Sequence, residues 1–125
     1  MDKQTFISEI SDQLKKLDFK KAKSYWYKYC NDVIFCIHLQ SSQWDPEDYY
    51  VEIGVALSAN NFSRPSLLQW YCRHRCCGIT GDKNILPGEF MLCISYYLDK
   101  LSSFEDVEAL LREENATKVA SQYWF

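Results

Sequence analysis

The densest group of reactive side chains in this sequence is the segment YCRHRCCG, from Tyr71 to Gly78, which holds three cysteines, two arginines and one histidine. Thiolates and imidazole nitrogens are common zinc ligands, and a thiolate beside positive charge can act as a nucleophile. The segment could therefore be half of a metal site or a reactive redox centre. It could equally be a β-strand whose small apolar positions are cysteines.

The spacing of these residues argues against a metal site. A structural zinc site commonly takes two close pairs of ligands from separate segments, and the sequence contains no C-x-x-C pair. The other histidine, His38, belongs to a different predicted strand. Cys72, His74 and Cys76 would still project from one face of a strand, so a metal-binding or small-molecule-binding sensor built on them is the alternative function. We otherwise expect no metal and no cofactor.

The remainder of the chain offers no catalytic constellation. Its glycines are scattered, so there is no glycine-rich phosphate loop, and no H-x-x-x-H, G-x-S-x-G or paired-carboxylate motif occurs. A cysteine nucleophile needs a neighbouring base and a lowered pKa. Period-two alternation places Arg73 and Arg75 on the strand face opposite Cys72. We therefore predict that the protein is not an enzyme.

Composition and the first residues suggest a compartment and exclude some partners. The start, MDKQTFISEI, lacks the basic patch and apolar run of a signal peptide, and no later apolar run is long enough to cross a bilayer. We expect a cytoplasmic protein with no membrane partner, whose six cysteines are reduced and mostly buried. A net charge of −3 gives no reason to expect binding to nucleic acid.

Hydrophobic periodicity predicts the elements that position these side chains. Residues 5–17 carry apolar side chains at helical spacing. Two aromatic or β-branched runs then flank Asn31 and Asp32, a pair that suits a two-residue hairpin turn and would place Cys30 opposite Val33. The chain therefore begins with a helix followed by a β-hairpin.

The later part of the chain predicts two more strands and two more helices. Residues 49–58 and 67–77 alternate as strands, and helical patterns cover 89–101 and 103–114, the last of which opens with a capping-box-like Ser-x-x-Asp. We predict one domain, residues 1–125, of the α+β class. It should contain an N-terminal helix, an antiparallel sheet of about four strands and two C-terminal helices packed on the sheet.

The predicted hairpin has two different faces. The more apolar face should pack against the helix, and it carries Trp26, Lys28, Cys30, Val33, Phe35, Ile37 and Leu39. The other face is a stripe of tyrosines with a histidine, and it carries Tyr25, Tyr27, Tyr29, Ile34, Cys36 and His38. This stripe is either a partner-binding surface or a second core layer covered by the C-terminal helices.

The order of motifs in the first half resembles a bacterial family of unknown function, the one numbered 4304. The matching residues are Leu17, Phe19 and Lys20 at the end of the helix, Leu39, Gln40 and Ser42 along the next strand, and Ile53 with Gly54 in the third. The chain departs from the family pattern at Asp18, Ser41 and Glu52. Some relatives look like neighbours of toxin genes, so the resemblance implies an immunity protein that blocks a cognate toxin.

We therefore expect a cytoplasmic protein-binding domain of the immunity type, with a toxin as its partner and a basic nuclease domain as one candidate toxin. Acidic residues outnumber basic ones from Asp99 onward, which suits a basic partner, although such runs are usually solvated helix faces. Aromatic side chains supply anchors at interfaces. The predicted partner-binding residues are Tyr25, Tyr27, His38, Trp44, Asp45, Glu47, Asp48, Glu105 and Glu108.

Overall fold

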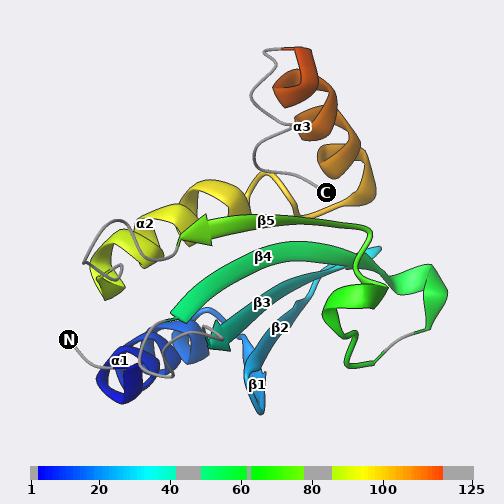
Figure 1. The fold of residues 1–125 in the computed structure, drawn as a ribbon. Helices are drawn as coiled ribbons and strands as arrows, with labels where there is room; N and C mark the ends of the chain where they lie inside the picture. Colours follow the sequence, from blue (N-terminus) through cyan, green and yellow to red (C-terminus); the bar gives the residue numbers. More distant parts are fainter. Residues whose placement is uncertain (1–2, 42–48, 62, 78–85, 117–125) are drawn as a thin grey trace.

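The computed structural model describes residues 3–41, 49–61, 63–77 and 86–116; the side chains of 74–77 and 114–116 are not described. The chain forms an α+β fold, as predicted (Figure 1). Its elements are α1 (Lys3–Lys16), β1 (Lys20–Ala22), β2 (Tyr25–Tyr29), β3 (Val33–Ser41), β4 (Tyr49–Leu57), η1 (Ser58–Asn60), η2 (Leu67–Gln69), β5 (Cys72–Cys77), α2 (Pro87–Leu98) and α3 (Phe104–Ala116). No helix within the described residues has the length and apolar character needed to cross a bilayer.

The five strands form one antiparallel sheet in the order β1-β2-β3-β4-β5, so β1 and β5 are its two edges. The hairpin between β2 and β3 has the predicted register, because the backbone N–H of Cys30 donates to the carbonyl oxygen of Val33 at 3.0 Å. The sequence prediction missed β1. This strand is three residues long, and two of them are lysines, so it carries no hydrophobic alternation.

The strand predicted over 67–77 is shorter in the structure, where its first residues form the 3₁₀ helix η2. Ser66 and Gln69 make a capping box at that turn, with each side chain accepting a hydrogen bond from the other residue's backbone N–H. These reciprocal bonds stabilise a helical turn where the side-chain pattern favours a strand. Trp70 consequently departs from the predicted alternation with Cys72 and belongs to a different part of the core.

The main core lies between the first face of the sheet and the three helices. Phe6 on α1 packs against Tyr49 on β4 and Phe90 on α2, with ring centroids 4.8 and 5.9 Å apart. Val107 and Leu110 of α3 belong to the same buried cluster. The prediction that both C-terminal helices pack on the sheet is therefore confirmed.

The second face of the sheet is also partly covered, but by the segment between β4 and β5 rather than by the C-terminal helices. Figure 1 shows this segment at the right of the view, at the end of the sheet away from α2. Trp70 from this segment forms a second buried cluster with Tyr27, Ile34, Cys36 and Ala56. The tyrosine stripe therefore belongs in part to a second core layer.

Candidate partner-binding surface

The thiol-rich segment is a strand in the structure, and its described cysteine is buried. Cys72 begins β5, is 5% exposed and is a free thiol. Burial raises the pKa of this thiol to about 12, with a smaller upward contribution from the charge of Glu108. A thiol with that pKa stays protonated at neutral pH, whereas metal ligands and nucleophiles are thiolates. Cys72 is thus suited to packing.

The alternative function, a sensor built on Cys72, His74 and Cys76, draws no support from this environment. The side chains of His74 and Cys76 lie outside the described residues. Among the residues that are described, no group of three or more His, Cys, Asp or Glu side chains could hold a metal ion.

The other described cysteines divide into free thiols and one disulfide. Cys30 and Cys36 are free, and burial raises the pKa of both thiols above the ordinary value. Cys93 on α2, by contrast, is disulfide-bonded. The prediction that all six cysteines are reduced is therefore wrong for Cys93. Sequence context suggests a compartment, but only the fold decides which thiols lie within bonding distance.

The tyrosines predicted to bind a partner are held against the segment that covers the second face. Tyr27 is 3% exposed, and its hydroxyl donates to the carbonyl oxygen of Pro65 at 2.8 Å. Tyr25 is half-buried, and its hydroxyl accepts from the backbone N–H of Leu67 at 3.3 Å. The burial of Tyr27 argues against direct contact with a partner, because its ring and hydroxyl are already used within the fold.

His38 lies on the same face, beside Tyr25 and opposite the buried Glu52. The rings of His38 and Tyr25 are 4.2 Å apart, and His38 pairs with Glu52 across the β3–β4 register. Glu52 is only 2% exposed. Burial lowers the pKa of His38 below its ordinary value, and the charge of Glu52 opposes this shift. Burial therefore favours the neutral form of the His38 imidazole.

The acidic residues predicted on the last helix do reach the surface, and the structure brings aromatic side chains beside them. Glu105 is exposed on α3, and Glu108, four residues after the start of that helix, accepts a hydrogen bond from the Tyr71 hydroxyl. Tyr71 is 43% exposed and Phe104 is 36% exposed, with their rings in edge-to-face contact at 5.5 Å. We call these four residues the acidic-aromatic surface.

Sequence reasoning missed Tyr71 and Phe104 as members of this surface. Tyr71 stands next to the thiol-rich strand, and Phe104 opens a helix whose later apolar residues are buried. Nothing in the periodicity separates these two rings from the aromatic residues of the core. Their partial exposure follows from the way α3 docks beside the start of β5.

The predicted site residues do not form one cluster. Tyr25, Tyr27 and His38 lie on the second face of the sheet, whereas Glu105 and Glu108 lie on α3. Trp44, Asp45, Glu47 and Asp48 were also predicted to bind a partner, and they lie outside the described residues. Of the five acidic residues in the predicted set, Glu105 and Glu108 are described, and they lie on α3 near the rings of Tyr71 and Phe104.

The fold and this surface define an α+β domain whose antiparallel sheet has a core layer on each face. Residues 10–80 match the family described as Domain of unknown function (DUF4304), and the chain belongs to this family. The match extends from α1 through β5 and leaves out α2 and α3. No curated protein and no solved structure matches the chain.

Proposed function

We propose that this protein is a non-catalytic protein-binding domain, and that it acts as an immunity protein which binds and blocks a cognate bacterial toxin. The acidic-aromatic surface carries the proposal. Tyrosine and phenylalanine are enriched in the centres of protein interfaces, where they bury a large area at a small cost in side-chain entropy. Here two such rings contact one another while remaining partly exposed.

The charge of α3 favours a basic partner. The helix, FEDVEALLREENA, contains five acidic residues and one arginine. Glu105 and Asp106 lie in its first turn, where negative charge also stabilises the helix dipole. Glu108 lies beyond that turn and faces Tyr71, so the dipole does not account for its position. Enzymes that cut nucleic acid are positively charged where they bind it, which makes a basic nuclease a suitable toxin for this surface.

The state of the described thiols supports a non-catalytic role. Cys30, Cys36 and Cys72 all have a pKa above the ordinary thiol value, chiefly because burial disfavours the thiolate. Protonated, buried thiols are poor nucleophiles.

A co-expression experiment tests the proposal. The protein would be produced together with the product of the gene adjacent to its own, and complex formation and protection of the host from that product would be measured. We expect a stable complex and full protection. Phe104→Ala and Glu108→Lys should each weaken binding at least tenfold, because they remove a central ring and reverse a charge.

Glu9→Lys is the matched control, since it makes the same charge reversal at an exposed position on α1. It should leave binding within about twofold of the unmodified protein, provided circular dichroism shows that all variants are folded. Absence of a complex and of protection would end the proposal. Equal losses for Glu9→Lys and Glu108→Lys would show that overall charge, and not this surface, governs binding.

A further inference from the structure

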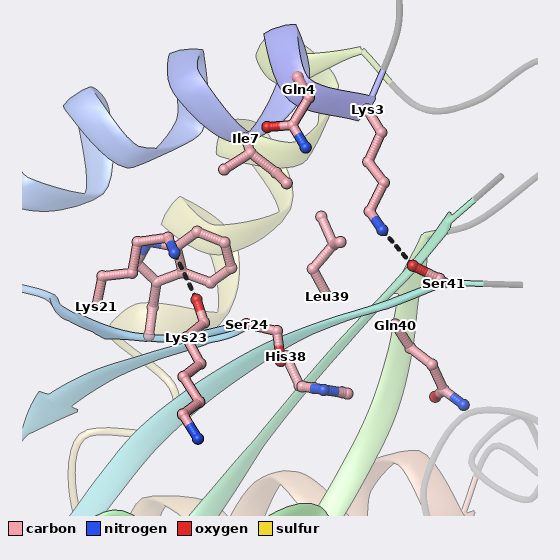
Figure 2. Close-up of a pocket in the computed structure, with 11 residues that line it drawn as sticks. Lys3, Gln4, Ile7, Lys21, Lys23, Ser24, His38, Leu39, Gln40 and Ser41 are labelled. Carbon is pink, nitrogen blue, oxygen red and sulfur yellow. Dashed lines mark hydrogen bonds between the residues drawn. The ribbon is translucent and has the colours of Figure 1, made fainter. Parts of the chain in front are cut away.

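The outer face of α2 is apolar, and this distinguishes α2 from α1. Within Lys3–Lys16 every exposed side chain is polar, and the half-buried Ile7 points toward Leu39 of β3 (Figure 2). On α2, by contrast, Leu92 is 74% exposed and Tyr96, one turn later, is 55% exposed. The outer face of a helix in a soluble domain ordinarily carries polar residues. Neighbouring exposed apolar side chains on this face therefore indicate a contact with another molecule.

The ring of Tyr96 is held in place on this face by residues close to it in the chain. It lies edge-to-face with the ring of Tyr97, with the ring centroids 4.9 Å apart, and Tyr97 is itself half-buried against the main core. The Lys100 ammonium group lies 5.0 Å from the centre of the Tyr96 ring. A side chain that is already restricted loses little conformational entropy when a partner covers it.

Charged residues flank Leu92 and Tyr96 in an order that suits a second copy of the same helix. Glu89 is exposed in the first turn of α2, and Lys100 follows the last turn. These two residues are about three helical turns apart, so they lie on the same side of the apolar face. Asp99 is also exposed, but at about 100° per residue it lies on the other side of that face.

We infer that α2 pairs with α2 of a second copy of this chain, with the two helices antiparallel about a twofold axis. A twofold axis brings the same surface of both copies together, so that surface must complement itself. In the antiparallel order, Leu92 of one copy packs on Tyr96 of the other. Glu89 of each copy then lies opposite Lys100 of the other, on the same side of the contact. A parallel order would instead bring like charges and like helix-dipole ends together.

The contact is small, so the dimer should be weak. Helix α2 contains 12 residues and is therefore about 18 Å long. One pair of helices of this length buries less than the roughly 800 Å² per partner of a stable interface. The dimer should therefore form at high protein concentration and dissociate on dilution. The outer face of α2 shares no residue with the acidic-aromatic surface, so the inference does not depend on the proposed immunity function.

Sedimentation equilibrium of the full chain tests the inference. We expect the average mass to rise toward twice that of one chain as the concentration increases from about 10 µM to about 1 mM, the range in which weak contacts form. Leu92→Glu should raise the dissociation constant about tenfold or more, because it buries a charge at the centre of the contact. The matched control Gln13→Glu adds the same charge at an exposed position on α1 and should change the constant less than about twofold.

Reversing the flanking charges tests the antiparallel order. Glu89→Lys and Lys100→Glu should each weaken the dimer about threefold or more, because each puts like charges opposite one another. The double variant restores opposite charges and should recover the original dissociation constant to within about twofold. Circular dichroism would establish that every variant is folded.

A chain that stays monomeric across this concentration range would overturn the inference. If Leu92→Glu then weakened the complex with the adjacent gene product, the outer face of α2 would belong to that partner instead. Equal effects of Leu92→Glu and Gln13→Glu would also overturn the inference, as would a double variant that dimerises no better than the single variants.

Discussion

At Gly54, in the middle of β4, the fold leaves no room for a side chain. A Cβ added there would meet the carbonyl oxygen of Cys72, lie 2.8 Å from a ring carbon of Trp70 and lie 3.0 Å from the Cα of Arg73. Two of these three neighbours are backbone atoms of the adjacent segment, which cannot move without disturbing the β4–β5 ladder. Glycine at this position therefore allows Trp70 to lie on the sheet.

We predict that Gly54→Ala lowers the free energy of unfolding by about 2 kcal/mol or more, because overpacking of a rigid core costs about 1–3 kcal/mol. Chemical denaturation measures the change. Gly88→Ala is the control, since an added Cβ on that α2 residue meets nothing within 4 Å. It should be neutral or stabilise by up to about 1 kcal/mol through helix propensity. Equal stabilities for the two variants would contradict the prediction.

The environment of His38, also at the scale of a single residue, leads us to predict that the stability of the fold depends on pH. Burial lowers the pKa of His38 in the folded protein, against the opposing charge of Glu52 across the register. The unfolded chain therefore binds this proton more readily than the folded chain. The contribution of neutral His38 to the free energy of unfolding is fully present above the ordinary histidine pKa of about 6.5. It is lost as the pH falls below that value.

Urea denaturation at pH 7.5 and pH 5.5 should therefore show a smaller loss of stability for His38→Gln than for the unmodified protein. NMR titration of the imidazole should give His38 a pKa below 6.5. His74 is the other histidine of the chain. Its replacement by Gln should leave the His38 titration unchanged. A His38 pKa at or above 6.5 would show that the charge of Glu52 outweighs burial.

At the scale of elements, α3 is fixed by a residue far away in the sequence. The Asp32 carboxylate, in the turn between β2 and β3, accepts a hydrogen bond from the backbone N–H of Phe104 at 2.9 Å. Ser103 accepts another from the N–H of Asp106 at 3.1 Å, which matches the predicted helix start. The hairpin turn thus caps the helix that carries the acidic-aromatic surface.

We predict that Asp32→Ala destabilises the protein by about 1 kcal/mol, the usual cost of losing a side-chain cap. Asp32→Asn keeps an oxygen acceptor and should cost less than half as much. The neighbouring change Asn31→Ala tests the turn without touching the cap. Thermal or chemical unfolding measures all three variants. Equal losses for Asp32→Ala and Asp32→Asn would mean that the acceptor is not what stabilises α3.

At the scale of the whole molecule, stability should decrease from the centre of the sheet toward its β1 edge. Strands β3 and β4 are nine residues long, are paired on both sides and lie between the two core clusters. Strand β1 is three residues long, pairs on one side and has two exposed lysines. Charged residues on a short edge strand discourage pairing with another chain.

Hydrogen exchange tests this gradient. We predict that amides within Ile34–Leu39 and Ile53–Val55 exchange only through global unfolding, with protection close to the full free energy of unfolding. Amides of Lys20–Ala22 should exchange at least a hundredfold faster through local opening. Similar protection of β1 and β3 would show that the sheet opens as one unit and would contradict the gradient.

Local sequence patterns were sufficient to predict the elements whose buried residues recur at a regular spacing along the chain. The apolar stripe of Phe6, Ile10 and Leu14 predicts α1 because one helix face is buried, and all three are fully buried. The Asn31-Asp32 turn fixes the register of the β2–β3 hairpin because side chains alternate with a period of two. The acidic character of α3 can likewise be read directly from its sequence.

The sequence by itself determined the α+β class, the first hairpin and the acidic last helix, because these depend on contacts between near neighbours. Tertiary structure decided that β1 joins the sheet, that Trp70 and Pro65 cover Tyr27, and that Tyr71 meets Phe104. It also decided that Cys93 forms a disulfide. Each of these depends on residues far apart in the chain, whose distance is set by packing of the whole core and leaves no periodic trace in the sequence.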